Sequence, residues 1–326
     1  MIYLESESTD PYYNLALEEY VFERLPKNEK YFILWQNSPS VIVGKYQNTA
    51  EEVNADYVRA NGIKVARRIT GGGAVYHDLG NLNYTFIVDA GENCTFDFGL
   101  FALPVIRTLK KFGIDAELSG RNDLTIGGRK FCGNSQCIRN RRLLHHGCIM
   151  VDSDLSAVSL SLNTRAAKFV SKATKSVRSR VTTINENAKD KISVETFRET
   201  LKNEVFSEHE VSYYSLNGND EAAINKLAAE KYATWEWNYG SSPEYDMERT
   251  EKFDSGLVCV KMKVRNGIIE DIGIYGDFFG NGDIRVIQDA LRGAKISENL
   301  EDRLSGIDLN DFINGVSPQQ LCGLLR

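Results

Sequence analysis

The sequence predicts an α/β fold followed by a small α+β domain. Three observations support this prediction. The chain has 326 residues, which exceeds the size of one average domain. Segments with strand and helix patterns alternate from the N-terminus onwards, and a second run of strand patterns begins near residue 245. We therefore expect one domain at residues 1–244 and a second at residues 245–326.

The first domain opens with a helix signal. Asp10 is a favourable N-cap, and Pro11 suits the first helical position. The helix is expected to end before Pro26 and to present one face made of Leu17, Tyr20, Val21 and Arg24. Further strands are expected at residues 31–35, 40–43, 63–68, 83–88, 124–126, 130–135 and 146–151. Further helices are expected at residues 54–60, 98–112, 154–162, 194–206 and 219–231.

The second domain begins with the pattern of a strand hairpin. Apolar residues alternate with Cys or Lys between positions 258 and 264, which is the period of a half-buried strand. Asn266 and Gly267 favour a tight hairpin turn, so residues 268–275 are expected to form the return strand. A helix is expected at residues 283–291, with shorter helices after it.

Charge is unevenly distributed along the chain. The formal net charge is −6, yet residues 121–180 hold twelve Lys or Arg against three Asp or Glu. Residues 241–326 hold ten basic and fifteen acidic residues. A basic middle in an acidic protein indicates a site for an anionic ligand or an acidic partner, although a solvated basic face would look the same. Nucleic acid is a poorer fit, because the overall charge is negative and none of the common nucleic-acid motifs is present.

Several classes of protein are disfavoured by the sequence. It contains no run of about 18 apolar residues, so no membrane span is expected. The first residues lack a basic segment followed by an apolar one, which favours a cytoplasmic location over secretion. Six cysteines without CxxC spacing favour free thiols over disulfides or a zinc site.

Residues 67–78, RRITGGGAVYHD, are the most informative segment. Glycine lets the backbone turn tightly, so successive N–H groups can point at an anion. The neighbouring arginines, Arg67 and Arg68, add fixed positive charge that suits phosphate. Taken alone, three consecutive glycines more often form a glycine-rich hairpin turn beside solvated arginines, and the segments that follow reverse this preference.

Several further segments, taken with this one in order, give a more specific signal. The chain resembles the lipoate–protein ligases, within the superfamily that includes biotin–protein ligases and octanoyl transferases. The matching segments are residues 67–78, 120–124 (GRNDL), 128–134 (GRKFCGN), 145–147 (HHG), 176–182 (SVRSRVT) and 235–240 (WEWNYG). The tail after about residue 245 resembles the family's accessory domain. The resemblance implies a mixed-sheet catalytic domain at residues 1–244 and covers nearly the whole chain.

The resemblance implies a two-step reaction. Lipoate and Mg-ATP would form lipoyl-AMP and pyrophosphate, with Mg2+ as the cofactor of ATP. The lipoyl group would then pass to a lysine of a lipoyl-domain protein. The implied acceptors are the acyltransferase subunits of 2-oxoacid dehydrogenases and the H protein of the glycine cleavage system, with neither nucleic acid nor membrane as a partner.

Site residues follow from the same resemblance and from the chemistry of joining two anions. Lys130 is the expected catalytic residue, as an ammonium that donates to the acyl carbonyl and the α-phosphate together. Asp123 is the candidate magnesium ligand, or else a plain turn carboxylate. The expected ATP or adenylate residues are Arg68, Thr70, Gly73, Ala74, Val75, Tyr76, Asn122, Asp123, Lys130, Lys172 and Arg178. The expected lipoate residues are Gly72, His77, Lys130 and His146.

Two rival functions stay open at this point. Some relatives of the family move acyl groups through a cysteine thioester without ATP. Cys148 and Cys132 lie in basic surroundings that could lower a thiol pKa, although buried cysteines are more often inert. The other rival is a non-catalytic protein that binds lipoate or a lipoyl domain, and the retained polar residues argue against it.

Overall fold

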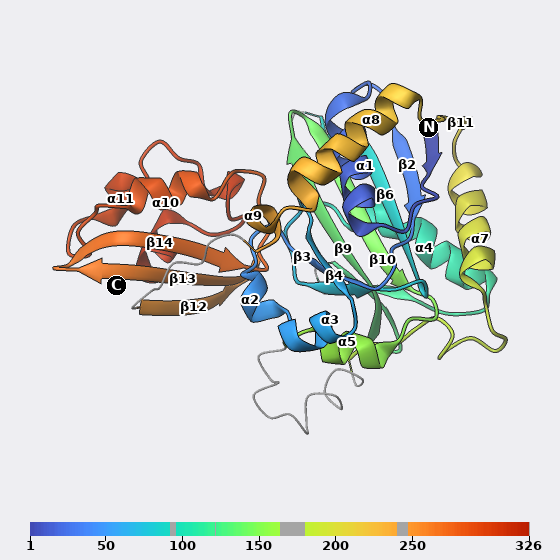
Figure 1. Ribbon diagram of the computed structural model, residues 1–326, viewed down its shortest axis with the longest axis horizontal. Helices are drawn as coiled ribbons and strands as arrows, with labels where there is room; N and C mark the ends of the chain where they lie inside the picture. Colours follow the sequence, from blue (N-terminus) through green and yellow to red (C-terminus); the bar gives the residue numbers. More distant parts are fainter. Residues whose placement is uncertain (92–95, 121, 164–179, 240–246, 326) are drawn as a thin grey trace.

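The computed structural model describes residues 1–91, 96–120, 122–163, 180–239 and 247–325. The N-terminal part contains a large and a small sheet, and the C-terminal part contains a third sheet beside them (Figure 1). The expected boundary at residues 244 and 245 lies outside the described residues. None of the described helices is long and apolar enough to cross a membrane.

The large sheet is mixed, as expected for this fold class. Its eight strands run in the order β11-β1-β2-β6-β10-β9-β8-β7. The first three are parallel to one another, and every later neighbour is antiparallel. The bounds, in that order, are Ser212–Tyr213, Ile2–Glu5, Tyr31–Trp35, Asn81–Asp89, Arg142–Met150, Arg129–Arg139, Asp123–Ile126 and Glu117–Ser119.

The small sheet has the order β4-β3-β5, with bounds Lys64–Arg67, Ser40–Val43 and Val75–His77. Strand β3 pairs parallel with β4 and antiparallel with β5. The consecutive strands β2 and β3 match the predicted ranges, but they belong to different sheets. The chain therefore leaves the large sheet at Pro39, and this crossing brings the glycine loop of residues 71–74 over the large sheet.

Helices cover both faces of the large sheet (Figure 1). Helix α1 (Pro11–Arg24) packs with α8 (Gly218–Leu227) on one face. Helices α4 (Gly99–Lys111) and α7 (Val194–Phe206) pack on the other. Shorter helices surround them: α2 Thr49–Glu52, α3 Ala55–Ala60, α5 Leu155–Ser161, η2 Ala228–Tyr232 and α9 Trp235–Asn238.

Helix α1 begins as predicted, because the Asp10 side chain accepts from the backbone N–H of Tyr12 and Pro11 occupies the first turn. Its buried face differs from the expected one. Arg24 is exposed and Tyr20 is only half-buried. The buried residues are Pro11, Asn14, Leu15, Ala16, Leu17, Glu18, Val21 and Phe22, so two polar side chains lie in the apolar stripe.

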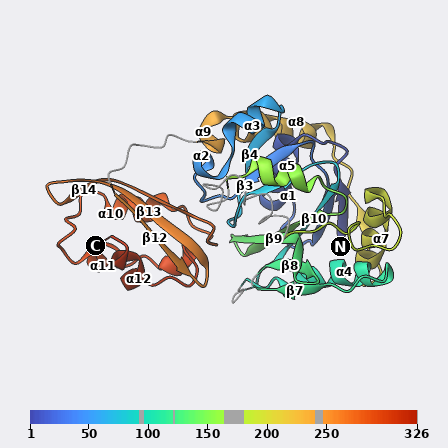
Figure 2. The ribbon, with the colours of Figure 1, turned by 90° about the horizontal axis from the view of Figure 1, so that it is seen from below.

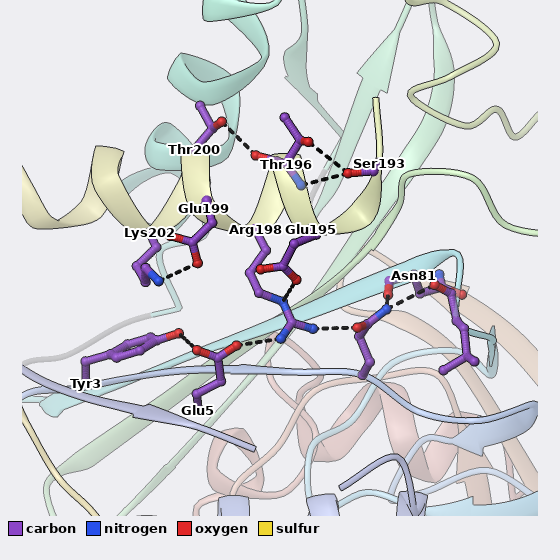
Figure 3. Close-up of polar contacts among 12 residues, drawn as sticks. Tyr3, Glu5, Asn81, Ser193, Glu195, Thr196, Arg198, Glu199, Thr200 and Lys202 are labelled. Carbon is purple, nitrogen blue, oxygen red and sulfur yellow. Dashed lines mark hydrogen bonds and ion pairs between the residues drawn. The ribbon is translucent and has the colours of Figure 1, made fainter. Parts of the chain in front are cut away.

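Helix α7 is tied to the large sheet by Arg198 (Figure 3). The Arg198 guanidinium donates to Glu5 of β1 and to Gln36. Gln36 in turn donates to the backbone carbonyl of Asn81, at the start of β6. This chain of contacts fixes the first residues of β6, which lead into the functional pocket.

The C-terminal part is a three-stranded sheet of β12 (Met247–Phe253), β13 (Gly256–Arg265) and β14 (Ile268–Gly276). The predicted turn is confirmed, with Asn266 at φ 53° and Gly267 at φ 75°. Strand β12 was not predicted, because its sequence MERTEKF is mostly charged and exposed. Helices α10 (Arg285–Leu291), α11 (Leu300–Arg303), η3 (Leu309–Asp311) and α12 (Pro318–Gly323) complete this part.

The C-terminal part contacts the N-terminal part through the segment after β14 (Figure 2). Tyr46 stacks on Phe278, with ring centroids 4.7 Å apart, and its hydroxyl donates to the carbonyl of Gly280. The Lys45 ammonium donates to the carbonyl of Gly282 at 2.8 Å. Burial lowers the pKa of Lys45 to about 8.

Candidate active site

A pocket lies between the glycine loop and the face of the large sheet that α1 covers. Residues that lie directly opposite one another in neighbouring strands share a face of the sheet. Trp35, Asn83, Cys148 and Gly133 form such a row across β2, β6, β10 and β9, and all four line the pocket. The pocket is therefore a slot that crosses the strands, and this row forms its floor.

Lys130 lies at one end of the slot. Its side chain is one third exposed, and its Nζ is 2.8 Å from the Asp123 carboxylate. A Cβ on Gly133 would lie 2.8 Å from Nζ, so the absence of a side chain there lets Lys130 extend over the floor. The backbone of Lys130 pairs with that of Arg180 and Thr182, which brings Arg180 to the same end.

Asn122 and Asp123 lie near Lys130. Asn122 donates to the backbone carbonyl of Asn134, and the Asn134 side chain donates back to the carbonyl of Asn122. Asp123 begins β8, and its carboxylate pairs with Lys130. A group of three His, Cys, Asp or Glu residues suited to a metal is absent from the part of the chain that the structure describes.

Arg68 holds the glycine loop in shape. Its buried guanidinium donates to the carbonyls of Gly71 and Gly73 at 2.6 and 2.9 Å, and to the Thr70 hydroxyl. Gly72 adopts φ 87°, which favours glycine. Burial lowers the pKa of Arg68 to about 10, so it is charged at neutral pH. Arg68 lines the slot, and the glycine loop itself uses part of its hydrogen-bonding capacity.

The neighbouring arginine has a different environment. The Arg67 guanidinium donates to the carbonyls of Gly44, Gln47 and Asn238 and to the Thr49 hydroxyl. These contacts join β4 to α2 and α9. Arg67 therefore fastens the small sheet that carries the glycine loop.

A buried relay of hydrogen bonds supports the slot from below. Arg68 donates to Thr70, whose hydroxyl is 2.8 Å from His146 Nε2. His146 Nδ1 is 2.8 Å from the Glu18 carboxylate, which also accepts from the Thr85 hydroxyl. The relay is satisfied when Nδ1–H donates to Glu18 and Nε2 accepts from Thr70. The relay places His146 in the lining of the slot.

Glu18 is a site residue that the sequence reading missed. It is 2 % exposed, on α1, in a stripe that otherwise packs against the sheet. A buried carboxylate requires hydrogen-bonding partners, and both of its partners lie on β strands that are distant in sequence. The signal available was a glutamate one turn after Asn14 on the buried side of the helix.

His77 lies at the opposite end of the slot from Lys130. It is 3 % exposed, and its ring packs edge-on against Trp35 with centroids 6.0 Å apart. Asn37 contacts His77 Nδ1 at 3.1 Å. Burial, followed by the charge of Arg68, lowers the pKa of His77 to about 3, so the ring is neutral near pH 7.

The other predicted residues divide into three groups. Gly72, Gly73, Ala74 and Val75 line the slot from the side of the glycine loop. The Tyr76 side chain packs among Val41, Val43 and other residues away from the slot, and Tyr76 lies opposite Val41 in the β3–β5 pair. Lys172 and Arg178 lie outside the described residues.

The environments of the two cysteines do not favour a thiolate. Burial raises the pKa of Cys148 to about 12, and its Sγ accepts from the Asn81 side-chain amide. Cys132 is fully buried, and burial raises its pKa well above the usual value. Nucleophilic cysteines need a lowered pKa, so both environments oppose the thioester mechanism.

Comparison with known families identifies the class of protein. A family model described as the lipoyl protein ligase A/B catalytic domain matches residues 10–206. A second, described as the bacterial lipoate protein ligase C-terminus, matches residues 242–325. The chain therefore belongs to the lipoate–protein ligase family, which confirms the resemblance drawn from the motifs.

Curated relatives match over the full length. The chain is 45% identical to lipoate–protein ligase 1 of Staphylococcus aureus over 97% of each protein. It is 39% identical to the lipoate–protein ligase LplJ of Bacillus subtilis over 100% of each. At this similarity the chain is an enzyme of the lipoate–protein ligase type.

Solved structures agree with the fold. LipL1 of P. falciparum, in complex with lipoate, superposes with a TM-score of 0.75 at 26% identity, covering 93% of this chain and 92% of that one. A lipoate–protein ligase A bound with ATP gives a TM-score of 0.61 at 27% identity, covering 73% and 97%. The mixed-sheet fold class is thereby confirmed.

Proposed function

We propose that the protein joins lipoate to ATP, forming lipoyl-AMP and pyrophosphate, and then transfers the lipoyl group to a lysine of an acceptor domain. The observation that carries this proposal is the position of Lys130. Its ammonium lies over the slot floor, beside a glycine loop and at the mouth of a pocket with apolar walls. The relatives solved with lipoate and with ATP support both substrates.

Lys130 neutralises the two anions that must meet. Carboxylate and triphosphate repel each other, so a fixed cation between them favours both binding and the transition state. In this proposal the ammonium leaves Asp123 and donates to the acyl carbonyl and the α-phosphate. Arg68 and the backbone of Gly73, Ala74, Val75 and Tyr76 bind the nucleotide, assisted by Thr70, Asn122, Lys172 and Arg178. Gly72, His77 and His146 belong to the acyl side.

Mg2+ would enter with ATP. Magnesium retains several waters and needs only one or two carboxylates in addition to phosphate oxygens. Asp123 is the one carboxylate described within hydrogen-bonding distance of Lys130 Nζ, so it fits as that single protein ligand. Bound magnesium would neutralise phosphate charge, while the residues of the slot align the carboxylate.

We also propose which proteins accept the lipoyl group. A bipartite ligase of Thermoplasma acidophilum, solved in a study with its E2 lipoyl domain, superposes with a TM-score of 0.63 at 29% identity, covering 76% of this chain and 98% of that one. This likeness supports an E2 lipoyl domain as acceptor. We further propose the acyltransferase subunits of 2-oxoacid dehydrogenases and the glycine cleavage H protein as acceptors, as the family resemblance implies. We also propose residues 1–244 as the catalytic domain and residues 245–326 as the accessory domain.

The test is intact-mass analysis of a purified lipoyl domain after incubation with the protein and lipoate. An adduct of one lipoyl group that requires Mg-ATP and is lost in Lys130→Ala supports the proposal. Pyrophosphate release without an adduct would point to a different acceptor. An adduct that forms without ATP from an acylated carrier, and disappears in Cys148→Ala, would establish the cysteine mechanism instead.

A further inference from the structure

The end of the slot beyond Cys148 holds two polar groups to which the proposed reaction assigns no hydrogen-bonding partner. Asn83 is 1 % exposed and His77 is 3 % exposed, and both line the slot. Asn83 Nδ2 and His77 Nε2 have no hydrogen-bond partner among the residues that the structure describes. Buried polar atoms are normally paired, so two such nitrogens in one pocket indicate a ligand acceptor.

Both nitrogens are donors. Asn14 donates to Asn37 Oδ1, which turns the Asn37 amide nitrogen towards His77 Nδ1. His77 Nδ1 must therefore accept, and the neutral ring carries its hydrogen on Nε2. The Asn83 Nδ2 group brings two further N–H bonds. The pair is uncharged, since burial keeps the pKa of His77 far below neutral pH.

The length of the slot indicates which part of lipoate reaches these donors. Neighbouring strands are about 4.8 Å apart, so Asn83 on β6 is about 10 Å from Gly133 on β9. Extended lipoate measures roughly 6 Å from its carboxyl carbon to the first ring carbon and roughly 9 Å to the far side of the ring, at about 1.3 Å per C–C bond. With the carboxylate beside Lys130, over Gly133, the dithiolane ring therefore lies between Cys148 and Asn83, within reach of the Asn83 side chain, and faces Trp35.

We propose that Asn83 and His77 donate hydrogen bonds to the dithiolane sulfurs and so select lipoate over acids that lack them. This inference rests on the proposed function and explains how the same site distinguishes lipoate from other acids. Sulfur is a weak acceptor, so each bond is modest. The discrimination comes mainly from the alternative, because a sulfur-free acid leaves both buried donors unpaired.

The test uses two acids of matched shape. 5-Cyclopentylpentanoate carries a carbon ring in place of the dithiolane, so its comparison with lipoate isolates the sulfurs. The measured quantity is kcat/KM for pyrophosphate release with each acid, and its ratio does not depend on the fraction of active enzyme. The wild type is expected to favour lipoate by about tenfold, and Asn83→Leu should bring the ratio close to one.

His77→Phe provides an independent variant that keeps a ring against Trp35 and should lower the ratio by several-fold. Ser161→Ala is the matched control, because the Ser161 hydroxyl is also buried without a partner among the described residues, yet it does not line the slot. Its ratio should equal that of the wild type.

Two results would overturn the inference. One is a ratio that stays at the wild-type value in Asn83→Leu. The other is a change in KM for ATP in place of the change in acid preference, which would assign the donors to the nucleotide. Neither result resembles failure of the proposed function, in which the wild type releases no pyrophosphate with either acid.

Discussion

The two ends of the slot solve different problems with different groups. At the Lys130 end the charged side chains are about one third exposed and pair with each other, with Lys130 Nζ 2.8 Å from Asp123. At the His77 end the donors are neutral and almost fully buried. A charged side chain that water still reaches pays little desolvation free energy, whereas a buried site favours uncharged donors. In this account the Lys130 end of the slot carries out the reaction, and the His77 end recognises the dithiolane ring of the substrate.

The largest expected effect comes from removing the charged end. Lys130→Ala should lower the rate of pyrophosphate release by about 1,000-fold, because one fixed donor to a developing charge is worth that much. Thermal stability should change little, since the side chain is partly exposed. The rate is measured by assaying released pyrophosphate, and the thermal stability is measured by a melting curve. A variant that retains activity within threefold would remove Lys130 from the mechanism.

The next prediction displaces Lys130 without deleting it. In Gly133→Ala the new Cβ would lie 2.8 Å from Nζ and 2.9 Å from Cε, so the lysine must move. A shift of about 1 Å in a catalytic group costs up to about 100-fold, so kcat should fall between tenfold and 100-fold. Gly218→Ala is the control, because nothing lies within 4 Å of its Cβ position. Equal activity in the two variants would contradict the prediction.

Glu18→Gln tests the relay beneath the slot. Thr85 and His146 both donate to Glu18 Oε1, and His146 Nδ1 also lies 3.0 Å from Oε2. A glutamine oxygen can accept both bonds, but its amide nitrogen then replaces Oε2 and faces the Nδ1–H of His146, donor against donor. This buried amide nitrogen is left without an acceptor, so the free energy of unfolding should fall by about 1–3 kcal/mol. Urea denaturation measures this loss. A variant as stable as the wild type would mean that the relay does not hold the fold.

His77 predicts a stability effect that depends on pH. Its pKa is about 3 in the folded protein, against about 6.5 when unfolded. The unfolded chain therefore gains a proton first as pH falls, and folded stability decreases below about pH 6.5. Between pH 7 and pH 5 the loss from this group is about 2 kcal/mol. Denaturation at both pH values should show a smaller loss in His77→Phe, and an equal loss would contradict the assignment.

Cys148→Ser should have the smallest effect. The thiol lies in the slot floor but has a pKa of about 12, so it is not a nucleophile at neutral pH. Serine keeps an acceptor for the Asn81 amide. ATP-dependent lipoylation should stay within about threefold of the wild type. Complete loss, with the protein still folded, would revive the thioester mechanism.

The sequence predicted best what depends on neighbours along the chain. The cap at Asp10, the turn at Asn266 and Gly267, and the strands 31–35 and 40–43 are all confirmed, because local backbone preferences determine them. Strand β12 escaped prediction since its charged residues gain strand structure from pairing with β13.

The residues of the candidate site also differ in whether the local sequence predicts them. Lys130, the glycine loop and His146 carry recognisable motifs, and the structure brings them to one pocket. Glu18 and Asn83 carry no motif, because their burial depends on strands that are far away in sequence. Their roles emerge only when the register of the sheet is known.

The most direct measurement of the central claim is a crystal structure with a stable analogue of lipoyl-AMP. The account predicts Lys130 Nζ between the acyl carbonyl and the phosphate position, with a dithiolane sulfur within hydrogen-bonding distance of Asn83 Nδ2 and His77 Nε2. An analogue bound in the reverse direction, with its adenine at Asn83 and His77, would contradict it.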